Sequence, residues 1–224
     1  MFDKRSFSAT RFAVAAASVA LLACALVLSG ARPARALSAT DMTGVLPPLQ
    51  FTMTRATDGK VVTAADYKGK IVLLYFGYTY CPDVCPTTLF NISNMLKKLG
   101  PQAKDVRVLF VTVDPNRDSL KVLKEYTDAF APQIVGLRGT QNELATLAKR
   151  YRVAYSVTPA SPGHPYEVSH SAGVYVFNRS GDIKLLFTNL SLANANIMGN
   201  FDDLQDLVAQ SGLPSLWQRV RNVF

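Results

Sequence analysis

Two short apolar runs constrain the fold of this chain more than any other feature of its sequence. Residues 71–76 (IVLLYF) are continuous and apolar, which is typical of a strand buried on both faces of a sheet. Residues 106–113 (VRVLFVTV), apolar except for Arg107 and Thr112, are predicted to be the next strand. Between them, residues 86–99 carry apolar side chains at helical spacing, and Gly100 and Pro101 end this predicted helix. A strand, a helix and a second strand indicate a sheet with helices packed on it.

The remaining periodicity extends this pattern to one α/β domain with a mixed sheet flanked by helices. Two β-hairpins are predicted, one around Asp58-Gly59 and one around the turn at residues 178–181. The further predicted strands are 51–54, 60–62, 134–137, 173–177 and 183–187, and the further predicted helices are 119–130, 140–151 and 197–208. The helix at 140 begins with the capping box Thr140-Gln-Asn-Glu143.

Composition places the chain among globular proteins. With 224 residues, 49% of them apolar and 18% charged, it is neither a disordered polyelectrolyte nor a disulfide-dense small scaffold. The net charge is +8, but residues 1–36 supply half of this excess. No run of basic residues follows, so we expect no nucleic acid among the partners.

The first 36 residues are predicted to direct export. Residues 12–29 form an uncharged hydrophobic segment behind a basic flank, which keeps the N-terminus in the cytoplasm and places the rest outside it. The segment is either a signal peptide cut after Ala34-Arg35-Ala36 or a short membrane anchor that is not cleaved. The short basic leader and alanine-rich core favour the periplasmic side of a bacterial inner membrane over the mitochondrial intermembrane space.

The chain is therefore divided into four parts. Residues 1–36 are the basic flank and signal or anchor segment, and residues 37–50, which lack periodicity and contain Pro47-Pro48, are a linker or extended arm. Residues 51–210 form the α/β domain. Residues 211–224 are a basic-aromatic tail, for which packing on the domain is favoured over contact with a membrane or partner.

Only two cysteines, Cys81 and Cys85, lie in the exported part. They follow the buried strand and precede a helix, a point where α/β sheets collect ligand sites. With Pro86 at the first helical position, Cys85 would lie near the helix N-cap, where the helix dipole favours a thiolate. A structural disulfide is disfavoured because a bridge over three residues restrains little of the unfolded chain. Redox exchange and metal binding remain.

A metal site would need a third ligand, and the chain has two histidines. His164 lies in a loop rich in turn formers and is predicted to be solvated. His170 directly precedes the strand at 173–177, where its position alone leaves ligand, core and turn roles open. Two thiolates and one imidazole form a soft set that suits Cu(I), can hold Cu(II) and could hold zinc, although zinc prefers a fourth ligand.

Three motifs resemble those of the Sco (SenC/PrrC) copper proteins. They are Tyr80–Thr87 (YCPDVCPT), Val113–Asp118 (VDPNRD) and the later His170-Ser171. The resemblance covers about residues 48–210 and implies a thioredoxin-like fold, consistent with the order of elements predicted above.

The resemblance also implies a ligand set and a function. Copper would be bound, one ion per chain, by Cys81, Cys85 and His170. Sco proteins help assemble the binuclear copper centre of cytochrome c oxidase subunit II as copper donors, thiol reductants or both. Subunit II or its assembly factors would therefore be the partners, and whether the chain is an enzyme stays open.

Four neighbouring positions carry their own expectations. The family usually has an aspartate directly before the ligand histidine, whereas this chain has Ser169, whose hydroxyl can still hydrogen-bond. Asp114 corresponds to an acidic residue close to the family site and is expected to orient the imidazole or balance charge, although an Asp-Pro pair also ends strands. Arg117 and Asp118 are interpreted as a loop charge and a helix cap.

Two functions follow from these residues. The first is a metallochaperone that delivers copper. The alternative is a thiol–disulfide oxidoreductase that uses Cys81 and Cys85 without delivering copper. Only the first requires His170, because thiol exchange needs the cysteine pair alone.

Overall fold

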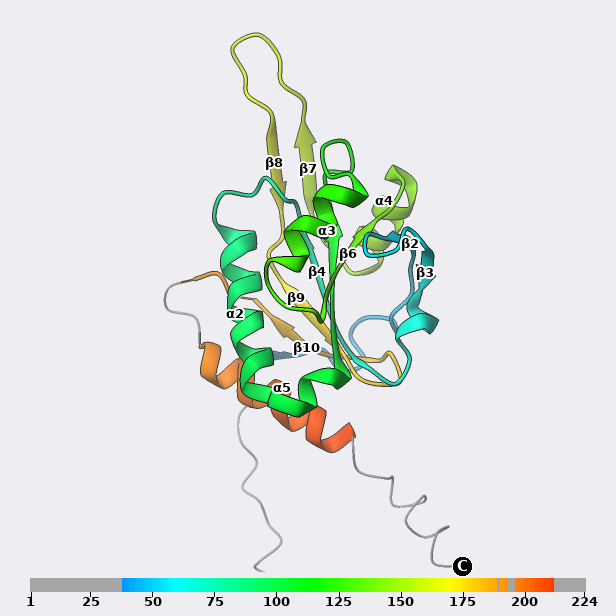
Figure 1. Cartoon of the computed structure of the whole chain (residues 1–224), viewed down its shortest axis with the longest axis vertical. Helices are drawn as coiled ribbons and strands as arrows, with labels where there is room; N and C mark the ends of the chain where they lie inside the picture. Colours follow the sequence, from blue (N-terminus) through cyan, green and yellow to red (C-terminus); the bar gives the residue numbers. More distant parts are fainter. Residues whose placement is uncertain (1–37, 189, 193–195, 212–224) are drawn as a thin grey trace, which may run out of the picture. The chain divides into compact units, whose positions relative to one another are not determined.

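The structure, a computed structural model, describes residues 38–188, 190–192 and 196–211, which belong to one compact unit spanning residues 37–224 (Figure 1). Within these ranges, no helix combines the length and the apolar character needed to cross a membrane. The predicted export segment, residues 1–36, and residues 212–224 of the predicted tail lie outside the described residues.

An eight-stranded mixed sheet forms the centre of the domain, in the order β1-β10-β9-β4-β5-β6-β2-β3. The central strands β4 (Ile71–Gly77), β5 (Val106–Thr112) and β6 (Ile134–Arg138) are parallel. The outer strands pair antiparallel with their neighbours and are β1 (Thr40–Asp41), β2 (Thr52–Arg55), β3 (Val61–Thr63), β9 (Val174–Phe177) and β10 (Ile183–Phe187). Every residue of β4 is buried, so the predicted two-sided burial of this apolar run is confirmed.

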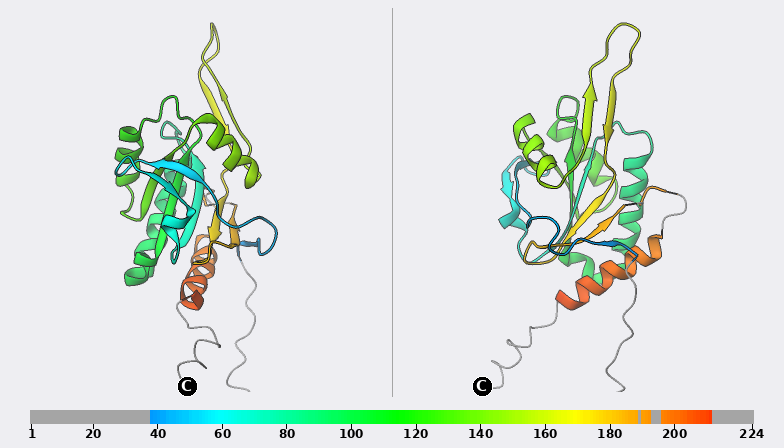
Figure 2. Two further views of the ribbon diagram at one scale, coloured as in Figure 1. Left: turned by 90° about the vertical axis from the view of Figure 1, so that its right-hand side faces the viewer. Right: turned by 180° about the vertical axis from the view of Figure 1, so that it is seen from behind.

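Helices cover both faces of this sheet (Figure 2). The α-helices are α2 (Val84–Leu99), α3 (Leu120–Asp128), α4 (Gln141–Arg150) and α5 (Ile197–Ser211), and the 3-10 helices are η1 (Ala64–Tyr67) and η2 (Gly100–Asp105). Helices α2, α3 and α5 pack on the face to which Tyr75 points, whereas α4 packs on the opposite face with Leu74. The alternation of neighbouring β4 residues between two cores is what a strand dictates.

The predicted start signal of α4 is confirmed, because Thr140 and Glu143 form its capping box. Helix α3 is capped by Ser119, whose hydroxyl accepts a hydrogen bond from the Val122 amide. Part of the predicted linker or arm at residues 37–50 belongs to the sheet, because β1 pairs with β10 and neighbouring apolar side chains are buried.

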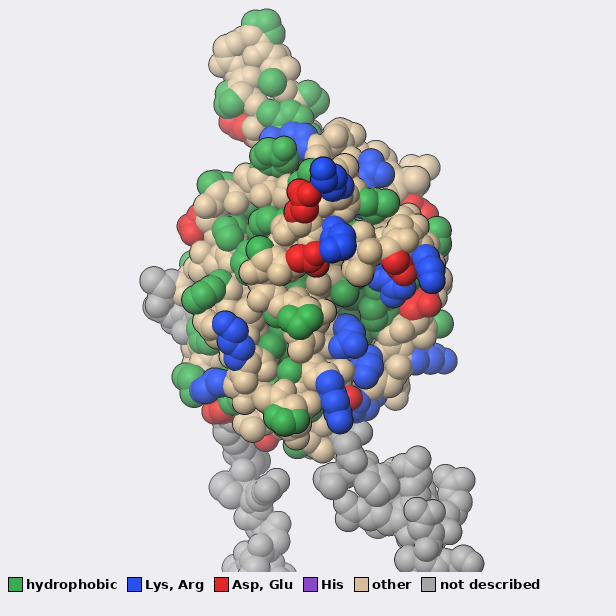
Figure 3. All heavy atoms as spheres, viewed as in Figure 1, with side chains coloured by type: hydrophobic (Ala, Val, Ile, Leu, Met, Phe, Trp, Pro, Cys, Tyr) green, Lys and Arg blue, Asp and Glu red, His purple; other side chains and the backbone are tan. Residues whose placement is uncertain are grey.

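One hairpin is not predicted by the sequence pattern. Strands β7 (Tyr155–Thr158) and β8 (Glu167–His170) pair only with each other, and they project from the body of the domain (Figures 1 and 3). His164 lies exposed in the turn at the tip, as expected for a solvated loop residue. At the other end of the hairpin, Tyr155 pairs with His170, so β8 delivers this histidine close to the main sheet.

Candidate metal centre

The two cysteines lie where β4 gives way to α2. Cys81 is in the connecting loop and Cys85 is in the first turn of the helix. The prediction that Pro86 begins the helix is wrong, because α2 begins at Val84 after the N-cap Asp83. Proline is tolerated at this third position because amides of the first turn have no partner within the helix.

One of these first-turn amides donates a hydrogen bond to a cysteine sulfur. The N–H of Cys85 donates to Sγ of Cys81 over 3.4 Å, and neither cysteine is in a disulfide. Hydrogen bonding from the Cys85 thiol, together with this amide, lowers the pKa of Cys81 to about 3. The same hydrogen bond and burial raise the pKa of Cys85. The hydrogen bonds at this helix N-terminus therefore favour the thiolate form of Cys81, whereas the sequence had placed this effect at Cys85.

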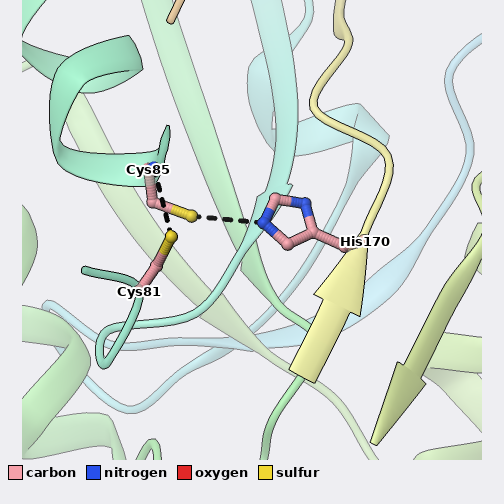
Figure 4. Close-up of side chains that lie close together, drawn as sticks. All are labelled: Cys81, Cys85 and His170. Carbon is pink, nitrogen blue, oxygen red and sulfur yellow. Dashed lines mark hydrogen bonds between the residues drawn. The ribbon is translucent and has the colours of Figure 1, made fainter. Parts of the chain in front are cut away.

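His170 ends strand β8 with its ring directed at the cysteines (Figure 4). Its Nε2 lies 3.3 Å from Sγ of Cys85, and its Nδ1 lies 3.0 Å from the carbonyl oxygen of Ser171. A carbonyl oxygen can only accept, so this hydrogen bond places the ring proton on Nδ1. Nε2 then presents its lone pair towards the sulfur atoms, which is the form that ligates a metal.

The three donor groups converge from a loop, a helix and a hairpin. The sulfur atoms of Cys81 and Cys85 and a ring nitrogen of His170 all lie within 4.8 Å of one another. Throughout the described ranges, no second group of three His, Cys, Asp or Glu side chains could hold a metal ion in this way. The donor set is soft and suits copper, whereas a structural zinc site needs a fourth ligand.

Aromatic rings and a glycine shape the space around these donors. The ring of Tyr78 meets the His170 imidazole edge-on, with 5.8 Å between centroids, and its hydroxyl donates to the carbonyl of Val168 over 3.4 Å. This contact joins the loop after β4 to strand β8. At the end of β4, a Cβ on Gly77 would lie 2.9 Å from Sγ of Cys85, so glycine is what permits the close approach of the sulfur.

Asp114 is fully buried, and it is not one of the three side chains that form the candidate metal site. Its carboxylate accepts hydrogen bonds from the Tyr166 hydroxyl, over 2.8 Å, and from Nε of Arg117. The guanidinium of Arg117 lies 3.9 Å from the centroid of the Tyr166 ring, so this residue is a partner of a buried carboxylate and not a free loop charge. Nδ1 of His170 hydrogen-bonds to the carbonyl oxygen of Ser171 and not to Asp114. A role of Asp114 in charge balance stays a prediction.

Asp118 is not the helix cap that the sequence indicates, because Ser119 caps α3. Asp118 is fully buried, where its carboxylate accepts from the Thr79 amide at 3.0 Å and from the Thr112 hydroxyl at 2.6 Å. It thereby fixes the loop that carries Cys81 to the end of β5. The sequence signal was present, since Asp118 lies in the motif VDPNRD, but motif membership does not distinguish a cap from a buried acceptor.

Ser169 precedes the histidine on β8 and is exposed, as alternation along a strand requires. Across the part of the chain that the structure describes, its hydroxyl makes no hydrogen bond, so the expected substitute for the family aspartate is not seen.

Known proteins resemble this chain in sequence. Residues 48–202 match the model of the SCO1/SenC family. The chain belongs to this family. The mitochondrial SCO2 homologue of Bos taurus is 38% identical over 133 residues, 58% of this chain and 48% of that protein. The mitochondrial SCO1 homologue of Homo sapiens is 36% identical over 134 residues, 59% and 44% of the two chains. The chain thus spans about half the length of the curated relatives it matches.

Solved SCO1/SenC structures share the fold. ScoI of Bradyrhizobium japonicum, solved with copper bound, is 38% identical with a TM-score of 0.62, covering 71% of this chain and 98% of that one. Apo Sco1 of Thermus thermophilus is 31% identical with a TM-score of 0.68, covering 79% and 99%. The predicted thioredoxin-like fold is confirmed.

Proposed function

We propose that this chain is a copper metallochaperone that binds one ion through Cys81, Cys85 and His170. It delivers copper to the binuclear site of cytochrome c oxidase subunit II, reduces the cysteines of that site, or does both. The observation that carries the proposal is the convergence of three soft donor atoms within 4.8 Å. The copper bound in the Bradyrhizobium japonicum relative supports the same ion.

The exposure of the donors fits delivery. Cys85 is buried, whereas Cys81 and His170 are only half-buried, so the site is anchored on one side and open on the other. An ion with three ligands leaves a position for a donor from an acceptor protein. The ion can then pass by ligand exchange, in which one new bond forms as one old bond breaks, with no change of oxidation state.

The proposed setting is the periplasmic side of a bacterial inner membrane. Residues 12–29 would hold the chain at the membrane if they are not cleaved, and subunit II or its assembly factors would be the partners. The basic flank before the hydrophobic segment supports this orientation.

The unequal thiols support a second candidate, thiol–disulfide exchange. The half-buried Cys81 thiolate would attack an acceptor disulfide, forming a mixed disulfide and releasing one acceptor thiolate. Cys85 would lose its proton and attack the Cys81 sulfur, releasing the second acceptor thiolate. The acceptor gains two electrons, and this chain is left with a Cys81–Cys85 disulfide.

The variant His170→Ala separates these functions, with His164→Ala as a matched control because that histidine is exposed at the hairpin tip. Two thiolates still suit Cu(I), whereas Cu(II) needs the imidazole. We expect His170→Ala to keep a reversible disulfide and some Cu(I) affinity. It should lose stable Cu(II) binding and the thiolate-to-copper absorption, and His164→Ala should lose neither.

Cells that carry only one of these variants complete the test. If delivery is the function, His170→Ala cells assemble little oxidase at low copper. Normal oxidase with lost Cu(II) binding would favour the reductase. A wild-type Cu(II) spectrum in His170→Ala would remove this histidine from the site.

A further inference from the structure

Alternate residues along strand β8 face the body of the domain. Tyr166, Val168 and His170 are half-buried, whereas Glu167 and Ser169 between them are exposed. Successive side chains of an extended chain point to opposite sides, so the three half-buried residues share the side that faces the body. How His170 reaches the cysteines therefore depends on how the other two residues are held.

Tyr166 is held by the loop that follows β5. Its hydroxyl donates a hydrogen bond to Oδ1 of the buried Asp114 over 2.8 Å. The guanidinium of Arg117 lies 3.9 Å from the centroid of the Tyr166 ring, and Nε of Arg117 donates to the other carboxylate oxygen of Asp114. A hydrogen bond to a charged acceptor and a cation–π contact thus fix this one side chain.

The hairpin has little else to hold it in place. Strands β7 and β8 pair only with each other, so in the described residues no strand ladder joins them to the eight-stranded sheet. Val168 packs against the core that contains Leu74, and its carbonyl oxygen accepts from the Tyr78 hydroxyl over 3.4 Å. The Tyr166 hydrogen bond is shorter and its acceptor is charged, so it is the stronger of the two.

We propose that Tyr166 is a positioning residue for the copper site, because its anchorage on Asp114 and Arg117 holds the His170 imidazole beside the two sulfur atoms. The inference rests on the proposed function. Tyr166 precedes His170 by four residues, about 13 Å along an extended chain, and the chain continues from His170 into β9. Strand β8 is therefore fixed on both sides of the ligand.

Without this anchor, fewer molecules would hold the hairpin in its place on the body. Only those molecules present all three donors, and the apparent affinity falls in proportion to their fraction. The two oxidation states of copper should respond differently. Cys81 and Cys85 lie outside the hairpin, and two thiolates suit Cu(I), whereas Cu(II) needs the imidazole. A misplaced His170 weakens Cu(II) binding alone, whereas general damage to the fold weakens the binding of both ions.

The test compares Tyr166→Phe with Tyr80→Phe in the full chain. Tyr166→Phe keeps the ring on Arg117 and removes the donor to Asp114. The Tyr80 ring also lies near Arg117, 4.8 Å from its guanidinium, but it is exposed, and among the described residues its hydroxyl makes no hydrogen bond.

We expect the Cu(II) affinity of Tyr166→Phe to fall about tenfold, which corresponds to the loss of one charge-assisted hydrogen bond. Its Cu(I) affinity should stay within about twofold of the wild type, because the cysteine pair is unchanged. Tyr80→Phe should match the wild type for both ions. Competitive titration of each variant with Cu(I) and with Cu(II) measures these affinities.

Rescue by a related donor separates the hydrogen bond from packing. Replacing Tyr166 by 4-aminophenylalanine puts an N–H donor where the hydroxyl was, so the Cu(II) affinity and the thiolate-to-copper absorption should return towards the wild type. Tyr166→Ala removes both the donor and the ring, and it should lower the Cu(II) affinity further than Tyr166→Phe does. Equal losses with 4-aminophenylalanine and with phenylalanine would show that the hydrogen bond to Asp114 does not hold the hairpin, and would overturn the inference.

The failure of this inference differs from the failure of the proposed function. Wild-type Cu(II) affinity in Tyr166→Phe, or an equal loss of Cu(I) and Cu(II) affinity, would overturn the positioning role and leave the copper site standing. A wild-type chain that takes up no copper would overturn the proposed function and this inference with it.

Discussion

At the end of β4, Gly77 leaves the space that the Cys85 sulfur occupies. A Cβ there would lie 2.9 Å from the sulfur and 2.6 Å from the Phe110 ring. We predict that Gly77→Ala destabilises the protein by about 1–3 kcal/mol, as overpacking does, and weakens Cu(I) binding because the sulfur must move. Urea unfolding and competitive Cu(I) titration measure the two effects.

Gly136→Ala is the matched control for this prediction. Its Cβ would lie 3.1 Å from Cβ of Leu123, away from the three donors. It should leave copper affinity unchanged. Equal affinity in Gly77→Ala and the wild type would show that this contact does not set the sulfur position.

The low pKa of the Cys81 thiol leads to a second prediction at the residue scale. An unperturbed thiol has a pKa of about 8.5, whereas the pKa of Cys81 is about 3. Because the folded value is the lower one, the thiolate is retained as pH falls until the pH approaches 3. At pH 5, iodoacetamide should therefore alkylate Cys81 and spare Cys85, as measured by mass spectrometry of peptides.

Two controls accompany this labelling. Cys81→Ser should take up no label at pH 5, and unfolding in urea should abolish labelling at that pH, since the hydrogen bonds that lower the pKa are lost. Labelling of the folded protein that begins only near pH 8 would contradict the assignment of the thiolate.

At the scale of elements, Asp118 joins the loop after β4 to the end of β5. Asp118→Ala leaves the Thr79 amide and the Thr112 hydroxyl without their acceptor. We predict a loss of about 3 kcal/mol in the free energy of unfolding. Asp128→Ala removes an exposed carboxylate that pairs with Lys124, and should cost less than about 1 kcal/mol. Similar losses in the two variants would refute the structural role of Asp118.

The elements that the sequence predicted are those with strong local signals. Strand β4 follows from a continuous apolar run and β5 from a mostly apolar one. Helix α3 follows from helical spacing, and α4 from helical spacing and its capping box. The hairpin β7–β8 has no such signal, because its residues alternate between exposed and half-buried and pair only with each other. Its stability as an element depends on contacts with the body, such as the Tyr78 hydrogen bond, that are remote in sequence.

The site residues also fall into those that local sequence predicts and those that depend on the fold. The position of Cys81 and Cys85 between a strand and a helix is local, and it was predicted from the residues alone. The approach of His170, 85 residues after Cys85, depends on the fold and entered only through the family resemblance. The role of Asp118 as a buried acceptor was not predicted, because membership of the motif VDPNRD does not distinguish a helix cap from a buried carboxylate.

At the scale of the whole molecule, the distribution of charge predicts where the domain resides. Half of the net charge of +8 lies in residues 1–36, whereas positive and negative side chains are interspersed on the face of the domain in Figure 3. A reporter fused after Phe224 should be active only if it works in the periplasm. Activity of a reporter that functions only in the cytoplasm would contradict this topology.

The central claim is that the fold assembles one copper site from two thiols and an imidazole. Cu(I) titration of the purified protein, in its dithiol form and after oxidation of Cys81 and Cys85 to a disulfide, tests it most directly. The account predicts one tightly bound copper per chain for the dithiol form and none for the disulfide, which has no thiolate to offer. Equally tight binding by both forms would contradict it.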